Sequence, residues 1–246
     1  MSPHFTLEQL FNGSTLNINK PLRWTSFDAV NCIKLTANKL KLRNAEGQIR
    51  KLKIGHAGTL DPLATGVLVL CTGSCTKQIE SIQAQLKEYT GTFFIGATTP
   101  CYDLEKEPDT FFQTDLISAE LIHAVSKNFV GKIMQAPPVF SAVKVDGKRA
   151  YHLARAGQEV AIAEKEVTIY AFEITNITMP VVSFRVVCSK GTYIRSLAND
   201  FGKALQSGAY LSSLCRTKVG DYHLELSVTI EEVIARMHQL HQEQSQ

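Results

Sequence analysis

Segments with strand periodicity and segments with helix periodicity follow one another along this 246-residue chain, but they do not alternate regularly as in a βαβ fold. The spacing of apolar residues predicts strands at 16–21, 67–70, 89–98 and 210–219, and two more within 166–189 on either side of Met179-Pro180. Helices are expected after Thr25-Ser26, where Phe27, Val30 and Ile33 share a helical spacing, and at 79–86, 121–129, 192–205 and from Thr229 onward. Such a mixture predicts an α+β fold in which a mixed, largely antiparallel sheet is flanked by helices and loops.

The composition is that of a folded protein with a substantial core, because 44% of the residues are hydrophobic and the net charge is only +3. The opening sequence MSPHFTLEQLFNG lacks the basic start and the apolar run of a signal peptide. No apolar stretch approaches the roughly 18 residues that span a membrane. The six cysteines match neither a disulfide framework nor the paired spacing of a zinc site. We therefore expect a soluble, cytoplasmic protein.

The stretch between Lys39 and Lys53 is strongly basic, with six cations and Glu46 as its only acid. A solvated linker has this composition, and so does a loop that contacts phosphates. The residues alone leave both interpretations open.

Asp61 lies in the loop GHAGTLDPLATG, which leads into the strand-like run at 67–70. Pro62 favours an extended backbone at Asp61, and the glycines at 55, 58 and 66 allow the loop to turn tightly. Such a loop can hold a carboxylate in a fixed position. An Asp-Pro pair between glycines is also typical of an ordinary turn.

Four separated motifs carry a resemblance to a known family. They are LNINKPLRWTSFDAV, KIGHAGTLDPLATGVLVLCTG, QAPPVFSAVKVDGKRAYHLARAG and CSKGTYIRSLANDFGKAL. Together they span about Leu16 to Asp221 and resemble bacterial tRNA pseudouridine synthases of the TruB family, which act on uridine 55. The resemblance implies the pseudouridine synthase fold, with a catalytic domain at 1–226. The sequence departs from the family at its C-terminal end, where we expect 227–246 to form a helix with a polar tail in place of a complete C-terminal RNA-binding domain.

By this resemblance, Asp61 corresponds to the catalytic aspartate, which acts at the ribose C1′ while the bond to uracil N1 breaks and the base rejoins through C5. Tyr89 matches the family's active-site tyrosine, a platform for the target base and a candidate base for the C5 proton. Arg195 matches the arginine that pairs with the aspartate and keeps it ionised and oriented. Read alone, Tyr89 fits a strand face and Arg195 fits a helix surface. The residues leave open whether the aspartate adds to C1′ or removes the 2′ proton.

The resemblance also implies which residues bind the substrate. His56 matches the histidine that contacts the tRNA loop beside the extruded nucleotide. Tyr193 and Leu214 align with positions that line the uridine pocket, and Lys20 is expected to meet a phosphate. The target base must leave its stack to react, at a cost of roughly a few kcal/mol. Isomerisation involves no net redox change and no hydrolysis, so we expect neither a cofactor nor a metal.

The expected activity is isomerisation of uridine 55 in the T-loop of tRNA to pseudouridine. We expect a monomer whose partner is the tRNA T-arm, with no obligatory protein partner and no membrane association. The segment 38–50 looks longer than the usual link of the family. Its charge suggests the hypothesis that it recovers tRNA affinity lost with the missing C-terminal domain. Alanine at Lys39, Lys41 and Arg43 should then weaken tRNA binding and flatten its salt dependence.

Three other interpretations fit parts of the sequence. A non-catalytic RNA-binding or tRNA-folding protein could keep the same fold, although the joint presence of Asp61, Tyr89 and Arg195 argues against it. A glycosidic hydrolase would need a second carboxylate, for which Glu88 and Asp103 are available without a supporting motif. The guide-RNA-dependent synthases of archaea and eukaryotes are a related family, and the compact length favours the stand-alone bacterial form.

Overall fold

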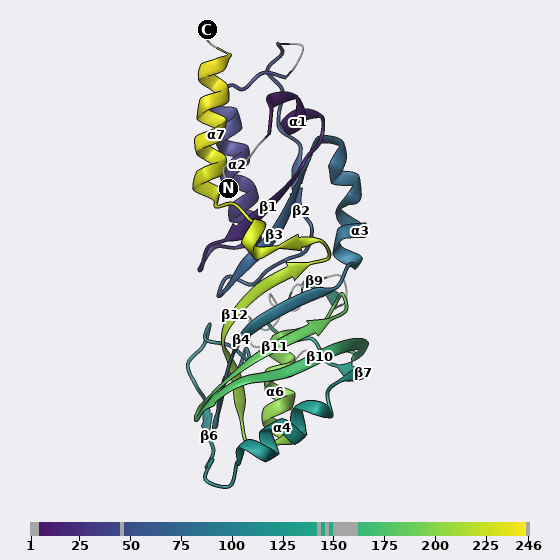
Figure 1. The fold of residues 1–246 in the computed structure, drawn as a ribbon, viewed down its shortest axis with the longest axis vertical. Helices are drawn as coiled ribbons and strands as arrows, with labels where there is room; N and C mark the ends of the chain where they lie inside the picture. The colour runs from purple at the N-terminus through teal and green to yellow at the C-terminus, as the bar shows by residue number, and fades with distance from the viewer. Residues whose placement is uncertain (1–4, 45–46, 142–143, 146–147, 150–161, 245–246) are drawn as a thin grey trace. The chain divides into compact units, whose positions relative to one another are not determined.

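The computed structural model describes residues 5–44, 47–141, 144–145, 148–149 and 162–244 (Figure 1). The chain forms two compact units: unit 1 contains residues 1–87 and 215–246, and unit 2 contains residues 88–214. The boundaries fall inside two strands, β4 (Lys87–Ile95) and β12 (Ala209–Val219), so each of these strands contributes residues to both units. No helix within the described ranges is long and apolar enough to cross a membrane.

Unit 1 combines antiparallel strands with helices. Its elements are α1 (Leu7–Asn12), β1 (Thr15–Lys20), α2 (Ser26–Lys39), β2 (Ile54–His56), β3 (Ala64–Thr72), the 3-10 helix η1 (Gly73–Gln78), α3 (Ile79–Ala84), the end of β12, β13 (Tyr222–His223), the 3-10 helix η2 (Leu224–Leu226) and α7 (Ile230–Glu243). Strand β3 pairs antiparallel with both β1 and β2, and β13 pairs antiparallel with β12.

Strand β3 is the centre of the core of unit 1, because both of its faces are buried. Leu68 and Leu70 belong to an apolar cluster that includes Ile18 of β1 and residues of α2 and α7. Val67 and Val69 belong to a second apolar cluster on the other face. A strand covered on both faces has a continuous apolar sequence instead of an alternating one, which is why the run at 67–70 contains no polar residue.

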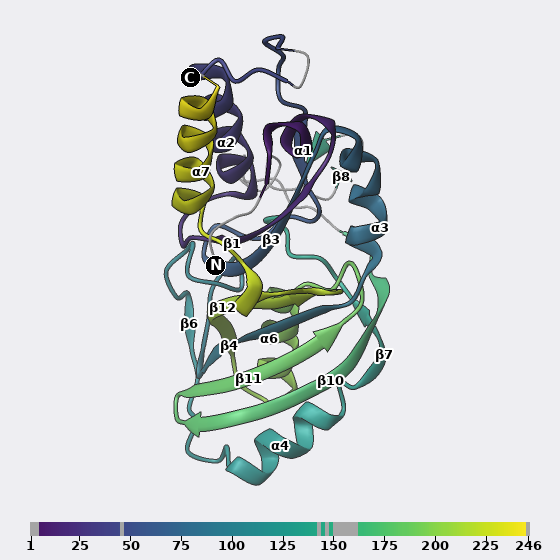
Figure 2. The same cartoon turned by 45° about the horizontal axis from the view of Figure 1, so that its top comes forward.

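Helices α2 and α7 lie side by side (Figure 1, Figure 2) and begin with the same kind of cap. The Thr25 hydroxyl accepts a hydrogen bond from the N–H of Asp28 at 3.0 Å, and the Asp28 carboxylate accepts one from the N–H of Thr25 at 2.8 Å. Thr229 and Glu232 form the same reciprocal pair at the start of α7. Each cap satisfies N–H groups that the first turn leaves unpaired, so the sequence signals for both helix starts are confirmed.

Phe27 shares the helical spacing of Val30 and Ile33, but it does not lie on the buried face of α2. Its side chain is 66% exposed, whereas Ile33 is fully buried. Six residues along a helix correspond to a rotation of about 240°, so these two positions lie about 120° apart around the axis. The apolar residues with this spacing therefore extend around more of the helix than the face that packs against the core.

The described residues of unit 2 form the remaining strands and two helices. Its elements are β4, β5 (Ala97–Thr98), β6 (Thr110–Phe111), α4 (Ala119–Lys127), β7 (Gly131–Gln135), β8 (Lys144–Val145), β9 (Lys148–Arg149), β10 (Lys165–Thr178), β11 (Val181–Cys188), α6 (Ile194–Ala204) and the start of β12. The main strands are neighbours in the order β12, β4, β11, β10, β7. Strand β10 pairs antiparallel with β11 and β7, while β5 with β6 and β8 with β9 form two small antiparallel pairs. The expected α+β fold with a largely antiparallel sheet is confirmed.

A cluster of phenylalanines fixes helix α6 against the strands of unit 2. Phe93 of β4 stacks on Phe184 of β11 with ring centroids 4.2 Å apart. Phe201 of α6 packs on Phe172 of β10 at 5.4 Å. All four side chains are buried, so the position of α6 is set by a close-packed aromatic core.

One sequence expectation differs from the structure in detail. The strand expected at 89–98 is divided into β4 and β5 at Gly96, whose φ of 97° is a conformation that favours glycine. The C-terminal helix α7 lies within unit 1 and shares its core. Residues 142–143, 146–147 and 150–157 of the motif QAPPVFSAVKVDGKRAYHLARAG lie outside the described residues.

Candidate active site

The loop that carries Asp61 joins β2 to β3 in unit 1, and most of its main-chain carbonyls are hydrogen-bonded. Five consecutive carbonyl groups accept hydrogen bonds, those of Gly58, Thr59, Leu60, Asp61 and Pro62. A loop with five paired carbonyls in a row has little conformational freedom. It therefore presents the Asp61 side chain from a pre-organised main chain.

The start of helix α2 provides part of this support. The buried Ser26 hydroxyl accepts a hydrogen bond from the N–H of Leu60 at 2.8 Å and donates one to the Leu60 carbonyl at 3.2 Å. The N–H of Arg23 donates to the Pro62 carbonyl at 2.7 Å, and the N–H of Ala64 donates to the Asp61 carbonyl at 3.0 Å. The motif around Thr25-Ser26 thus caps a helix and also fixes the loop of Asp61.

Arg216 of β12 supports the same loop, and the sequence analysis missed it. Its side chain is only 2% exposed. Its guanidinium donates to the carbonyls of Gly58 and Thr59 at 3.2 Å each and to the Val67 carbonyl at 2.7 Å. Gly66 permits this approach, since its φ is 102° and a Cβ atom there would lie 2.3 Å from the Arg216 carbonyl oxygen. The available sequence signal was a cation inside a predicted strand.

Lys20, at the end of β1, is fully buried. Its ammonium donates to the carbonyls of Trp24 at 2.6 Å, Pro21 at 2.8 Å and Pro62 at 3.5 Å. Burial lowers the pKa of Lys20 from 10.5 to about 8, the Asp61 carboxylate opposes this shift, and the Arg216 guanidinium adds to it. The phosphate contact expected of Lys20 stays a prediction. The geometry favours a role inside the protein, holding the loop of Asp61 and placing a positive charge near it.

The lowered pKa of Lys20 gives a testable pH dependence. Between about pH 8 and pH 10.5 the unfolded chain keeps the Lys20 proton that the folded chain has released. The unfolded state then binds more protons, so the contribution of this site to stability rises with pH. We expect the free energy of unfolding of the native chain, minus that of a Lys20→Met variant, to increase across this range. Urea unfolding at several pH values measures it, and a constant or decreasing difference would contradict the burial of this ammonium.

His56 ends β2 and lies half-buried at the other side of the loop. Burial lowers the pKa of His56 below its ordinary 6.5; a hydrogen bond with the Gly58 backbone opposes the shift and Arg216 adds to it. The buried Nδ1 atom has no hydrogen-bond partner in the described part of the chain. The ring is therefore neutral at pH 7, which suits stacking or hydrogen bonding with a base better than pairing with a phosphate.

In unit 2, Arg195 occupies the first turn of α6 and is only 5% exposed. Its Nε lies 3.6 Å from a carboxylate oxygen of Asp103, and its Nη1 donates to the Phe140 carbonyl at 3.2 Å. Asp103 is also buried, so this is an ion pair inside the protein. The sequence suggests for Asp103 only the role of a second carboxylate in a hydrolase, and it carries no signal for the pairing with Arg195.

The other carboxylate considered for a hydrolase also has a cationic partner. Glu88 of β4 lies 2.5 Å from a guanidinium nitrogen of Arg185 on β11. Glycoside cleavage needs a second carboxylate that acts as an acid or a base. Because Glu88 and Asp103 are each paired with an arginine, their ion pairs argue against the hydrolase interpretation.

The backbone of Tyr193 is fixed where α6 begins. The buried side-chain amide of Gln135 accepts a hydrogen bond from the Tyr193 N–H at 2.7 Å and donates one to the Tyr193 carbonyl at 3.1 Å. One turn later, the Ser196 hydroxyl donates to the Ala136 carbonyl at 2.7 Å. The end of β7 thus sets the position from which Tyr193 and Arg195 project.

The expected site residues fall into two sets. Lys20, His56 and Asp61 lie in unit 1. The charge of Arg216 acts on Lys20 and on His56, and its guanidinium holds the loop of Asp61 through the Thr59 carbonyl. Tyr89 of β4, Leu214 of β12, Tyr193 and Arg195 lie in unit 2, where all but Tyr193 are buried. The expected pairing of Arg195 with Asp61 would involve both units and stays a prediction.

Residues 44–194 match the family described as TruB family pseudouridylate synthase (N terminal domain), and residues 195–246 match the tRNA pseudouridylate synthase B C-terminal domain. The chain is similar to a protein of Flavobacterium johnsoniae named tRNA pseudouridine synthase B, with 56% identity over 92% of this chain and 96% of that protein. A protein of Parabacteroides distasonis with the same name is 52% identical over 90% of this chain and 92% of its own length.

Solved structures give a similar result. One chain of the archaeal box H/ACA sRNP Nop10-Cbf5 complex is 27% identical with a TM-score of 0.65, and the match covers 94% of this chain and 55% of that one. A chain of an H/ACA RNP bound to a substrate RNA containing 2′-deoxyuridine is 25% identical with a TM-score of 0.67, and the match covers 96% and 56% of the two chains. The chain thus spans about half the length of these solved chains.

Proposed function

Since this chain belongs to the TruB family of tRNA pseudouridine synthases, and is therefore an enzyme that isomerises uridine to pseudouridine in tRNA, we propose that its target is uridine 55 in the T-loop and that Asp61 is the catalytic carboxylate. The observation that carries the proposal is the support of the Asp61 loop. Five carbonyls in a row are hydrogen-bonded, two of them to a buried guanidinium. A pre-organised carboxylate is what chemistry at a single ribose carbon requires.

In the proposed reaction, Asp61 acts at C1′ of the target nucleotide while the bond from C1′ to uracil N1 breaks. The base turns within the site, and a new bond forms between C1′ and C5. The C5 proton leaves to a base, for which Tyr89 is the candidate, and N1 gains a proton. Every heavy atom of uridine is kept and the proton lost from C5 is balanced by the proton gained at N1, so the reaction as written consumes no water, oxidant or cofactor.

The remaining residues bind and orient the nucleotide. The neutral ring of His56 contacts the loop beside the extruded uridine, because an uncharged imidazole stacks well on bases. Tyr193 and Leu214 line the pocket for uracil, and Arg195 is the cation that pairs with the catalytic carboxylate. The ammonium of Lys20 adds positive charge near Asp61. The protein acts on the tRNA T-arm as a monomer without an obligatory protein partner.

The target is tested by mapping pseudouridine in an unmodified tRNA transcript after incubation with the protein. Carbodiimide labelling followed by primer extension is expected to give one stop, at position 55. A matched transcript with cytidine at this position is expected to give none. Modification at a different uridine would contradict the assignment of uridine 55 as the target. Unmodified transcripts in both reactions would contradict the proposed activity.

A further inference from the structure

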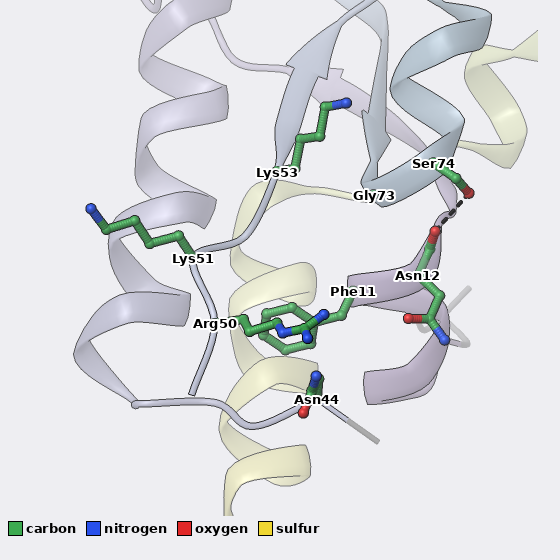
Figure 3. Close-up of a pocket in the computed structure, with 8 residues that line it drawn as sticks. All are labelled: Phe11, Asn12, Asn44, Arg50, Lys51, Lys53, Gly73 and Ser74. Carbon is green, nitrogen blue, oxygen red and sulfur yellow. Dashed lines mark hydrogen bonds between the residues drawn. The ribbon is translucent and has the colours of Figure 1, made fainter. Parts of the chain in front are cut away.

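A hollow of about 360 Å³ in unit 1 is separate from the residues assigned to the reaction. Three segments line it (Figure 3): Phe11 and Asn12 at the end of α1, Gly73 and Ser74 at the start of η1, and Asn44, Arg50, Lys51 and Lys53 from the basic stretch. We call it the basic pocket. The basic stretch therefore forms one wall of the hollow. From the sequence alone, this stretch could be either a solvated linker or a loop that contacts phosphates.

The charge of the basic pocket is positive and is not neutralised locally. Arg50, Lys51 and Lys53 are exposed, and none of the described residues that line the hollow is acidic. Among the residues that the structure describes, none of these three cations takes part in an ion pair. Concave positive surfaces of this kind concentrate anions.

The walls of the basic pocket are anchored to the core. Leu52 lies between the two lysines and is 2% exposed, within the same apolar cluster as Leu42. The N–H of Gly73 donates to the Lys53 carbonyl at 2.9 Å, and the Ser74 hydroxyl donates to the Asn12 carbonyl at 2.6 Å, the dashed line in Figure 3. A solvated linker would have neither contact, so the cations project from a supported main chain.

Asn44 adds a donor to the wall. Its side chain is 4% exposed, and its Oδ1 accepts a hydrogen bond from the Gln48 N–H at 2.8 Å, which fixes the orientation of the amide. Its Nδ2 has no hydrogen-bond partner in the described ranges, and Figure 3 shows it on the side of Arg50 and Phe11. A buried donor without an acceptor is costly, and an oxygen-rich ligand in the hollow would supply one.

We propose that the basic pocket binds the sugar-phosphate backbone of the tRNA substrate at nucleotides beside the target uridine. Phosphodiester oxygens match the cations and the amide donor, and the half-buried ring of Phe11 offers a face to a ribose or a base. Lys53 comes immediately before strand β2, and His56 is the last residue of that strand, so the two residues are about 10 Å apart along it. At an axial rise of about 3.4 Å per nucleotide, this distance corresponds to roughly three nucleotides. The choice of RNA as the anion rests on the proposed function.

The basic pocket revises the hypothesis about the basic stretch. Lys39, Lys41 and Arg43 do not line the hollow, and the Arg43 guanidinium donates to the Gly47 carbonyl at 2.9 Å. The cations expected to contact tRNA are therefore the three at the C-terminal end of the stretch. The other three provide a matched control, because replacing either set with alanine removes the same charge.

The test compares R50A/K51A/K53A with K39A/K41A/R43A by filter binding of a tRNA transcript at several salt concentrations. The pocket variant is expected to bind roughly 10- to 100-fold more weakly at low salt and to lose about two units from the slope of log K against log[salt]. The control variant is expected to change affinity less than about threefold. The variant R50K/K51R/K53R, which keeps the charges, is expected to bind like the native chain. Thermal unfolding confirms that each variant is folded.

Equal losses in the two alanine variants would mean that only net charge matters and would overturn the proposal, as would native affinity in the pocket variant. Acetylation of Lys51 and Lys53 separates RNA from free phosphate. Protection by tRNA alone supports the proposal, whereas equal protection by inorganic phosphate at the same phosphate concentration overturns it. Failure of the proposed function is a different result: the native chain would form no pseudouridine while the pocket variant still lost tRNA affinity selectively.

Discussion

An Asp61→Ala chain is expected to bind tRNA with near-native affinity and to form pseudouridine at least about a thousandfold more slowly. In the proposed mechanism this carboxylate acts at the atom where a bond breaks. Its removal changes the chemistry directly, whereas the loop is held through main-chain carbonyls that the substitution leaves in place. Asp61 is only half-buried, so the truncation creates no large cavity. Single-turnover rates and filter binding measure the two properties separately.

Asp28→Ala is the matched control for this prediction, because it removes another carboxylate from unit 1. Asp28 is exposed and accepts hydrogen bonds from Thr25 at the start of α2. Its loss is expected to lower stability by about 1 kcal/mol and to leave the rate within about threefold of native. Equal rate losses in the two variants would show that the effect of Asp61 is structural, and an active Asp61→Ala chain would exclude it as the catalytic group.

Arg216→Ala is expected to lower the free energy of unfolding by roughly 3–5 kcal/mol and to reduce kcat more than tRNA affinity. The substitution leaves the carbonyls of Gly58, Thr59 and Val67 without the guanidinium that pairs them inside the core. Two of these carbonyls belong to the loop of Asp61, so the carboxylate would lose its fixed position. Urea unfolding measures the first effect, and rates at saturating tRNA measure the second.

Two further variants separate positioning by Arg216 from simple stability. Arg216→Lys keeps a positive charge but cannot reproduce the planar set of donors, so we expect an intermediate kcat. Arg185→Ala removes a partly exposed arginine from an ion pair with Glu88 and is expected to cost no more than about 1 kcal/mol. If folded Arg216→Ala protein had the native kcat, Arg216 would be a structural residue without influence on the Asp61 loop.

Local signals in the sequence predicted most of the elements of the fold. The caps at Thr25 and Thr229 are formed by residues three positions apart, so the pattern that identifies them lies within one turn. The run at 67–70 is apolar because β3 is buried on both faces. Phe27 is exposed because the apolar spacing that it shares with Ile33 does not show how wide a face of the helix the core covers, and the two positions lie about 120° apart.

The supports of the candidate site could not be predicted in the same way. Arg216 and Thr59 are 157 positions apart in the sequence, and no local sequence pattern around either residue indicates that they form a hydrogen bond. The ion pair of Arg195 with Asp103 likewise depends on where α6 packs. Motif resemblance selected Asp61, Tyr89 and Arg195, but it carried no information about which carbonyls and side chains hold them. Those partners depend on tertiary packing, which the sequence pattern does not contain.

The most direct test of the central claim is the fate of tritium at C5 of uridine in a tRNA transcript incubated with the native chain. Isomerisation replaces the C5–H bond with a bond to C1′. The account therefore predicts release of tritium from one uridine per tRNA, no free uracil, and no release when the T-loop uridine is replaced or Asp61 is alanine. Free uracil would identify a hydrolase, and the absence of tritium release by a native chain that binds tRNA would contradict the assignment of Asp61 and its loop as a catalytic site.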